Sequence, residues 1–186
     1  TTNTVQSRKK QFLYVGNCYP HKNVDFLIAV FALFYKNHKD YSLIIAGHKD
    51  SFFLRLIKAT SELNPTLPVQ FVPDPSDEEL EVLYQTSELF IFPSLYEGFG
   101  LTGLEAMSKG LPVVSSNSSC LPEVYGSAAC YFESNSKSDL LAKLEQLASD
   151  PIVRDKLRLL GYEKAQLYSW RQLAVDTLAI YEKAMN

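Results

Sequence analysis

The chain has 186 residues, which suits one domain, and 46% of them are hydrophobic. Its 18 lysines and arginines against 21 aspartates and glutamates give a net charge of −3, so it lacks the basic balance of a nucleic-acid-binding protein. Its longest apolar runs fall far short of the roughly 20 residues that cross a bilayer. The composition therefore excludes these two classes and indicates a globular domain, which we expect in the cytoplasm.

The first ten residues contain the one basic cluster of the sequence, Arg8-Lys9-Lys10. We interpret residues 1–10 as a solvated linker and residues 11–186 as the folded domain. The chain also has three cysteines, Cys18, Cys120 and Cys130. Their odd number and their lack of metal-ligand spacing indicate free thiols in a reducing cytosol.

From residue 11 onward, short apolar runs alternate with helical patterns. The runs are β-branched or aromatic, as in buried parallel strands, and they cover 11–16, 41–47, 69–72, 89–93, 112–116 and 130–132. Apolar residues recur at helical spacing over 25–35, 52–63, 77–85, 102–109 and 137–148. This alternation predicts an α/β fold, a doubly wound, Rossmann-like parallel sheet of about six strands.

Helix-start signals support these segments. Ser76 and Ser138 each precede acidic residues, as capping residues do. Pro151 follows an aspartate, which predicts the first position of a helix there. No strand is predicted after it; two C-terminal helices follow, broken near Ser169, and Trp170 is expected to pack at their junction.

The stretch "YEGFGLTGLEAM" (96–107) lies between a predicted strand and a predicted helix. It contains the spacing G-x-G-x-x-G, with Glu123 about twenty residues further on, as in a dinucleotide-binding fingerprint. Three differences argue against that interpretation. The glycines do not follow the strand at once, Glu123 lies well past the next strand, and the motif falls in the fourth strand–helix unit rather than the first.

A nucleotide-sugar explains the same stretch better. Backbone amides at a helix N-terminus bind phosphate, and carboxylates accept hydrogen bonds from sugar hydroxyls. Glycines would let the backbone approach the phosphates closely, while Glu97 and Glu105 would each face a sugar. The alternative left open is a tight turn in which Glu105 is a surface charge.

The first strand-to-helix loop, "GNCYPHKN" (16–23), adds a cation to this edge of the sheet. Lys22 can neutralise a phosphate as a point charge. In the alternative interpretation Lys22 is a surface lysine and Asn23 caps the next helix. His21 is expected to support the turn.

Together, "FLYVGNCYPHKN", "FIFPSLYEGFGLTGLEAMSKGLPVVSSN", "LPEV" and "YSWRQLAVDTLAIYEKA" resemble the C-terminal half of a retaining glycosyltransferase of the large group-one family. The pair Glu97 and Glu105, with "AMSKGLPVV" after it, carries the most specific part of the resemblance. The resemblance implies one half of a GT-B fold, in which two Rossmann-like domains face each other across a cleft.

In that family the C-terminal domain binds the nucleotide-sugar donor. The resemblance implies that Lys22 binds the diphosphate, Glu97 the donor sugar and Glu105 the ribose, with Glu97 and Lys22 as the catalytic residues. The donor base is expected near 71–73. The other expected donor contacts are Gly16, Asn17, Phe71, Val72, Gly98, Phe99, Gly100, Leu101 and Thr102.

One position departs from the family pattern, because Asn17 stands where an arginine is common. The N-terminal acceptor domain is also absent from this chain, so we expect an excised domain that does not transfer sugar by itself. We expect no metal and no cofactor. The expected partners are a nucleotide-sugar and, through the missing domain, an acceptor glycan or lipid, which leaves peripheral association with the inner face of a membrane open.

Two other functions remain open at this level. A non-catalytic nucleotide-sugar-binding module would share every motif of this chain. A GT-B sugar-nucleotide epimerase would need acid–base residues of its own. The stretch "NCYPHKN" (17–23) is also similar to mannosyl- and rhamnosyl-type members that act on cell-surface polysaccharides.

Overall fold

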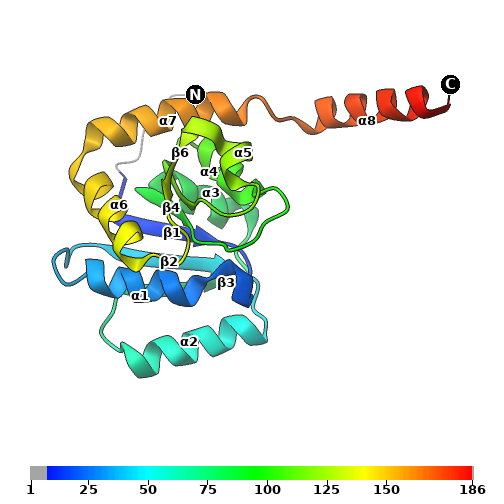
Figure 1. Ribbon diagram of the computed structural model, residues 1–186. Helices are drawn as coiled ribbons and strands as arrows, with labels where there is room; N and C mark the ends of the chain where they lie inside the picture. Colours follow the sequence, from blue (N-terminus) through cyan, green and yellow to red (C-terminus); the bar gives the residue numbers. More distant parts are fainter. Residues whose placement is uncertain (1–7, 186) are drawn as a thin grey trace.

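The computed structural model describes residues 8–185 of the chain. Six strands form one parallel sheet in the order β3-β2-β1-β4-β5-β6 (Figure 1). They are β1 Gln11–Val15, β2 Ser42–Gly47, β3 Val69–Pro73, β4 Leu89–Phe92, β5 Val113–Ser116 and β6 Ala129–Phe132. The doubly wound parallel sheet is confirmed, and each predicted strand bound lies within one residue of the observed one.

The predicted helices are also present. They are α1 Val24–Phe34, α2 Ser51–Leu63, α3 Asp77–Thr86, α4 Leu101–Ser108, α6 Lys137–Ser149, α7 Pro151–Ala165 and α8 Trp170–Met185. The sequence patterns missed three short elements, the 3-10 turns η1 Pro20–Lys22 and η2 Gly126–Ala128 and the helix α5 Leu121–Tyr125. Elements of three to five residues are too short to show a helical period.

The helix starts follow local side-chain chemistry. Ser76 caps α3 as predicted, and together with Glu79 it forms a capping box; Pro151 opens α7 as predicted. The predicted cap at Ser138 is wrong, because α6 already begins at residue 137 and Ser136 caps it instead. A cap must lie outside the helix so that its hydroxyl can accept from an amide of the first turn.

The core consists of two apolar layers, one on each face of the sheet. Phe12 and Tyr14 point into the layer covered by α1 and α6, whereas Leu13 and Val15 point into the layer covered by α4 and α5. Successive strand residues face opposite sides, so a sheet covered on both faces needs strands that are apolar throughout. This is why the strands appear as continuous runs in the sequence.

The strand order places a crevice at one edge of the sheet. The chain runs from β1 outward through β2 to β3, and then returns so that β4 pairs with the other side of β1. The connections that follow β1 and β4 therefore lead away in opposite directions. In such sheets ligands bind at this switch point, beyond the carboxyl ends of the strands.

Helix α8 leaves the body on the side to which the carboxyl ends of the strands point (Figure 1). None of its residues, Trp170–Met185, is buried. Trp170 is 75% exposed, so the prediction that it packs at the helix junction is wrong. The predicted break is confirmed, since Ser169 Oγ accepts from the Gln172 amide at 3.0 Å at the start of α8. Within residues 8–185, no helix is long and apolar enough to cross a membrane.

Arg8 holds the C-terminal ends of α3 and α4 together. Its guanidinium donates to the carbonyl oxygens of Tyr84 and Ser87, at 3.2 and 2.6 Å. It also donates to those of Lys109 and Gly110, at 3.2 and 2.7 Å. A cation is favourable at helix C-termini, and although burial lowers the pKa of Arg8 to about 10, Arg8 stays charged at neutral pH. The sequence predicted that Arg8 belongs to a solvated linker, and for Arg8 this prediction is wrong. Residues 1–7 of the predicted linker lie outside the described part of the chain.

Replacing Arg8 by alanine is expected to lower the free energy of unfolding by about 1–3 kcal/mol, because charged donors to four carbonyl groups are lost. Urea unfolding followed by circular dichroism measures this change. The control is Lys10→Ala, which removes an exposed ion pair with Asp40 and should change nothing measurable. Equal stability of the two variants would contradict the role of Arg8.

Candidate functional site

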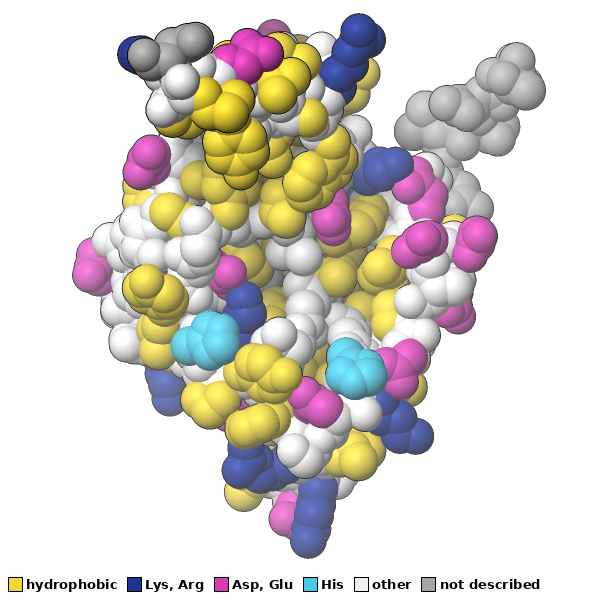
Figure 2. Space-filling view, turned by 90° about the vertical axis from the view of Figure 1, so that its right-hand side faces the viewer, with side chains coloured by type: hydrophobic (Ala, Val, Ile, Leu, Met, Phe, Trp, Pro, Cys, Tyr) yellow, Lys and Arg dark blue, Asp and Glu magenta, His cyan; other side chains and the backbone are white. Residues whose placement is uncertain are grey.

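A cavity of about 330 Å³ opens at the switch point between β1 and β4. Figure 2 shows this face of the molecule, with a hollow near its centre that basic, acidic and hydrophobic side chains surround. The cavity is lined by Tyr14, Val15, Gly16, Asn17, Lys22, Phe92, Glu97, Phe99, Gly100, Leu101 and Thr102. The structure thus brings together eight of the predicted site residues, six from the connections that follow β1 and β4 and two, Leu101 and Thr102, from the start of α4.

Lys22 and Glu97 form an ion pair at the wall of the cavity, with Nζ and Oε1 2.5 Å apart. Their side chains are only 17% and 10% exposed, so the alternative of a surface lysine is wrong. Asn23 precedes α1 but makes no side-chain cap. The Leu95 amide donates to the His21 carbonyl oxygen at 2.7 Å, which ties the two loops together.

The N-terminus of α4 faces the same cavity. Gly100 precedes the helix with φ of 90° and no side-chain cap, so the amides of Leu101 and Thr102 carry the positive end of the helix dipole without a capping oxygen. Leu101 and Thr102 both line the cavity. Uncapped amides opposite a lysine make a site suited to an anion.

Tyr125 explains why residues 100 and 103 are glycines. Its hydroxyl donates to the Gly100 carbonyl oxygen at 2.6 Å. A Cβ on Gly100 or Gly103 would lie 2.3 or 2.2 Å from that hydroxyl oxygen, whereas a Cβ on Gly98 would meet nothing within 4 Å. The glycines at 100 and 103 are therefore required by close packing of Tyr125 against the backbone, a reason that the sequence did not reveal.

Asn17 lines the cavity with an unused acceptor. Its Oδ1 is buried and has no hydrogen-bond partner among the described residues. The Asn17 carbonyl oxygen accepts from the hydroxyl of Tyr14 at 2.6 Å. Burial raises the pKa of Tyr14 well above its ordinary value, so that hydroxyl stays protonated and holds the loop in place.

Four other predicted residues, Gly98, Glu105, Phe71 and Val72, lie outside the cavity lining. Glu105 is exposed on α4, one turn beyond the lining residues, and accepts from the hydroxyl of Tyr84 at 3.1 Å. The side chains of Phe71 and Val72 are partly buried and pack against the two core layers. Glu123 lies exposed in the first turn of α5 and not directly after a strand, which agrees with the argument against a dinucleotide-binding fingerprint.

The loop after β5 contributes two contacts that sequence reasoning missed. Ser119 Oγ and Cys120 Sγ donate to the Glu97 carbonyl oxygen at 2.8 and 3.2 Å. Together with Tyr125 they fix the backbone that presents Glu97 and α4. The only signal available was the position of this loop at the carboxyl edge of the sheet.

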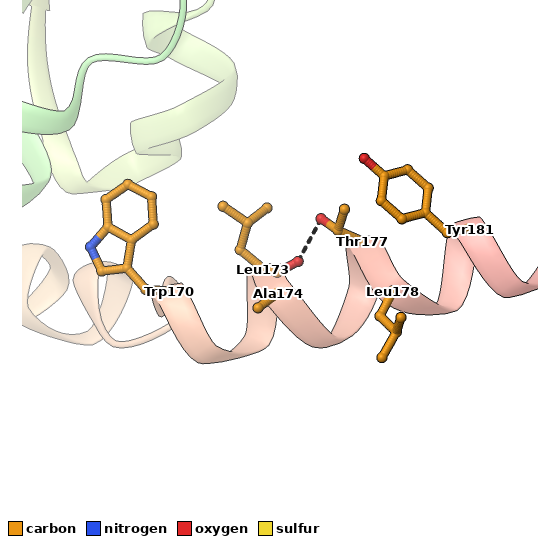
Figure 3. A pocket seen from close by; sticks show the side chains of 6 residues that line it. All are labelled: Trp170, Leu173, Ala174, Thr177, Leu178 and Tyr181. Carbon is orange, nitrogen blue, oxygen red and sulfur yellow. Dashed lines mark hydrogen bonds between the residues drawn. The ribbon is translucent and has the colours of Figure 1, made fainter.

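A second hollow runs along α8 (Figure 3) and does not resemble a ligand site. It is lined by Trp170, Leu173, Ala174, Thr177, Leu178 and Tyr181. All of these belong to one helix, and the hydroxyl of Thr177 already donates to the Leu173 carbonyl oxygen at 2.7 Å. It lacks the converging polar groups that bind and orient a small molecule.

The fold and the cavity define a doubly wound α/β domain with an anion-type site at its topological switch point. The model of the family "Glycosyl transferases group 1" matches residues 2–164, and the chain belongs to this family. It is 33% identical over 174 residues to the O-antigen chain mannosyltransferase B of Escherichia coli, covering 91% of this chain and 45% of that protein. The MMP alpha-(1->4)-mannosyltransferase of Mycolicibacterium hassiacum is 40% identical over 114 residues, which cover 59% of this chain and 28% of that protein.

Solved structures agree on the fold. The sucrose-phosphate synthase of Thermosynechococcus elongatus superposes with a TM-score of 0.84 at 25% identity, over 97% of this chain and 46% of that one. The C-terminal domain of a glycosyl transferase group 1 family protein from Francisella tularensis matches over 87% of both chains, with a TM-score of 0.73 and 21% identity. The chain thus has the fold of one half of a GT-B enzyme, and it spans less than half the length of the curated relatives named above.

Gly100→Ala is expected to lower the free energy of unfolding by about 2–4 kcal/mol, because the new Cβ meets Tyr125 and φ is positive. Gly98→Ala is the matched control, with open space and no positive φ, and should stay within about 0.5 kcal/mol of the parent. Urea unfolding of both variants tests the constraint. Similar stabilities would show that Tyr125 does not impose it.

Proposed function

We propose that this chain is the donor-binding half of a retaining glycosyltransferase, which moves a sugar from a nucleoside diphosphate sugar to a glycan or lipid-linked acceptor. The single observation that carries the proposal is the Lys22–Glu97 pair, which lies in one cavity with the uncapped N-terminus of α4. A cation and free amides suit a diphosphate, and a carboxylate beside them suits the hydroxyls of an attached sugar.

The diphosphate would lie between Lys22 and the amides of Leu101 and Thr102. Asn17 replaces the arginine common at its position, so one charge is missing from this site. Its amide nitrogen can still donate to a phosphate oxygen, and its buried, unpaired Oδ1 can accept from a hydroxyl. This arrangement supports a donor that brings both anionic oxygens and hydroxyl donors to the cavity.

The two glutamates would contact different parts of the donor. Glu97, on the cavity wall, faces the transferred sugar. Glu105 faces the ribose from the second turn of α4, where the hydroxyl of Tyr84 orients its carboxylate. The backbone at Phe71 and Val72 lies beside the base. The name of one relative, mannosyltransferase B, makes mannose the first sugar to test.

In the proposed reaction the bond from the anomeric carbon to the diphosphate breaks and the acceptor takes the sugar with retention. Negative charge then develops on the leaving diphosphate. Lys22 and the α4 amides are already oriented toward that charge, which is the arrangement that lowers a barrier electrostatically. Lys22 and Glu97 are the proposed catalytic residues, and the acceptor would be bound by a further domain in the cytoplasm or at the inner face of a membrane.

Lys22→Ala is expected to weaken binding of a nucleoside diphosphate about tenfold or more and to leave binding of the nucleoside nearly unchanged, because charge-assisted hydrogen bonds contribute about 1.5–3 kcal/mol. Calorimetric titration of the chain against a panel of nucleoside diphosphates measures both affinities. Lys49→Ala, an exposed lysine at the end of β2, controls for net charge. An equal loss for nucleoside and diphosphate would contradict a phosphate role for Lys22.

Glu97→Gln is expected to strengthen binding of a plain nucleoside diphosphate about threefold to tenfold, because Lys22 loses its competing partner. In the full-length enzyme the same change should lower turnover, since contacts with the transferred sugar act in the transition state. Glu105→Gln should instead weaken binding of the nucleoside diphosphate, because this ligand contains the ribose that Glu105 is proposed to contact.

Glu123→Gln, an exposed acid on α5, controls for the change in charge. The same calorimetric titration applies to all three variants. If Glu97→Gln and Glu105→Gln weaken binding of the nucleoside diphosphate equally, the proposal that the two glutamates contact different parts of the donor is wrong.

A further inference from the structure

Tyr168 contacts the donor loop from outside the cavity. It lies in the connection between α7 and α8, and its ring meets the ring of Phe99 edge to face, with centroids 5.4 Å apart and planes at 89°. Phe99 lines the cavity and lies just before the N-terminus of α4. A residue far along the chain therefore touches the segment that presents the anion-binding amides.

Other contacts hold Tyr168 in place from two helices. Its hydroxyl donates to the Val124 carbonyl oxygen of α5 at 3.1 Å, and its amide donates to the Ala165 carbonyl oxygen at the end of α7 at 3.2 Å. Lys164 Nζ lies 5.5 Å from its ring centroid. Tyr168 is thus fixed to the body although it is 38% exposed.

The Phe99 side chain packs on a single aromatic neighbour among the described residues. Phe99 is 40% exposed, and the contact with Tyr168 is its one ring–ring contact among the described residues. It follows Gly98, around which there is open space. Tyr125 holds the backbone at Gly100, and Ser119 and Cys120 hold it at Glu97. These hydrogen bonds fix the backbone on either side of Phe99, whereas the Phe99 ring packs edge to face on Tyr168.

We propose that Tyr168 is a positioning residue for the donor site, which holds Phe99 so that the amides of the loop are ordered before ligand binds. The proposal rests on the proposed function for its ligand but not for its geometry. A loop ordered in advance loses less conformational entropy on binding, which strengthens affinity. Since Ser169 alone separates Tyr168 from α8, the same residue joins the donor loop to the base of the exposed helix.

The test compares Tyr168→Ala with Tyr168→Phe in the full chain. Loss of the ring in Tyr168→Ala should weaken nucleoside diphosphate binding about threefold to tenfold, because that is the change in affinity that corresponds to the usual stabilisation by one aromatic pair. Phenylalanine keeps the ring contact and should restore the affinity. Tyr162→Ala, an exposed tyrosine of α7, controls for loss of an aromatic residue from the same region. In a Phe99→Ala background, Tyr168→Ala should add nothing.

Amide hydrogen exchange without ligand gives a second readout that does not depend on the proposed function. Tyr168→Ala should speed exchange at residues 99–102 and leave the core strands protected, whereas Tyr168→Phe should not. Equal effects of the two variants on affinity and exchange would assign the role to the hydroxyl bond with Val124 and overturn the proposal, as would no effect from either. If the parent chain binds no nucleoside diphosphate, the proposed function fails, and the exchange result alone decides the role of Tyr168.

Discussion

The contact between Tyr125 and the backbone at residues 100–103 is the constraint on which the site depends. The phenol lies where a Cβ at Gly100 or Gly103 would stand, and its hydroxyl bonds the Gly100 carbonyl oxygen. Burial raises the pKa of that hydroxyl above its ordinary value, so it remains a donor throughout the physiological range. Because Gly100 is fixed there, α4 begins with uncapped amides at the cavity, and the positive end of the helix dipole is available to the proposed anionic ligand.

The strand order brings this helix end to its partners. Since β4 pairs with β1, the loop that carries Glu97 lies beside the loop that carries Lys22, and the two side chains form a largely buried ion pair. Removing one partner of a buried ion pair is strongly destabilising, because it leaves the other charge buried without a partner. In the ligand-free chain each charge therefore satisfies the other, and a ligand with phosphate and hydroxyl groups can replace both contacts at once.

Most of the fold could be predicted from the sequence, because strands covered on both faces are apolar throughout and the helices carry clear caps. The sequence also predicted Gly100, Lys22 and Glu97 as site residues from the chemistry of phosphates and sugars, and the structure brings these three to one cavity. Tyr125, Ser119 and Tyr168 could not be found, because their roles depend on which loops meet in space. The predictions for Arg8 and Trp170 were wrong for the same reason. A short basic cluster in the sequence does not reveal the four carbonyl groups that Arg8 binds. A tryptophan in the sequence does not reveal that its helix is exposed.

The most direct measurement of the central claim is a ¹H–¹⁵N correlation spectrum of the chain titrated with a nucleoside diphosphate. The account predicts the largest shift changes at the amides of Asn17, Lys22, Leu101 and Thr102, with small changes along α8. Changes centred on α8 or on the exposed His48–Asp74 pair, with residues 101–102 unaffected, would contradict an anion site at the N-terminus of α4.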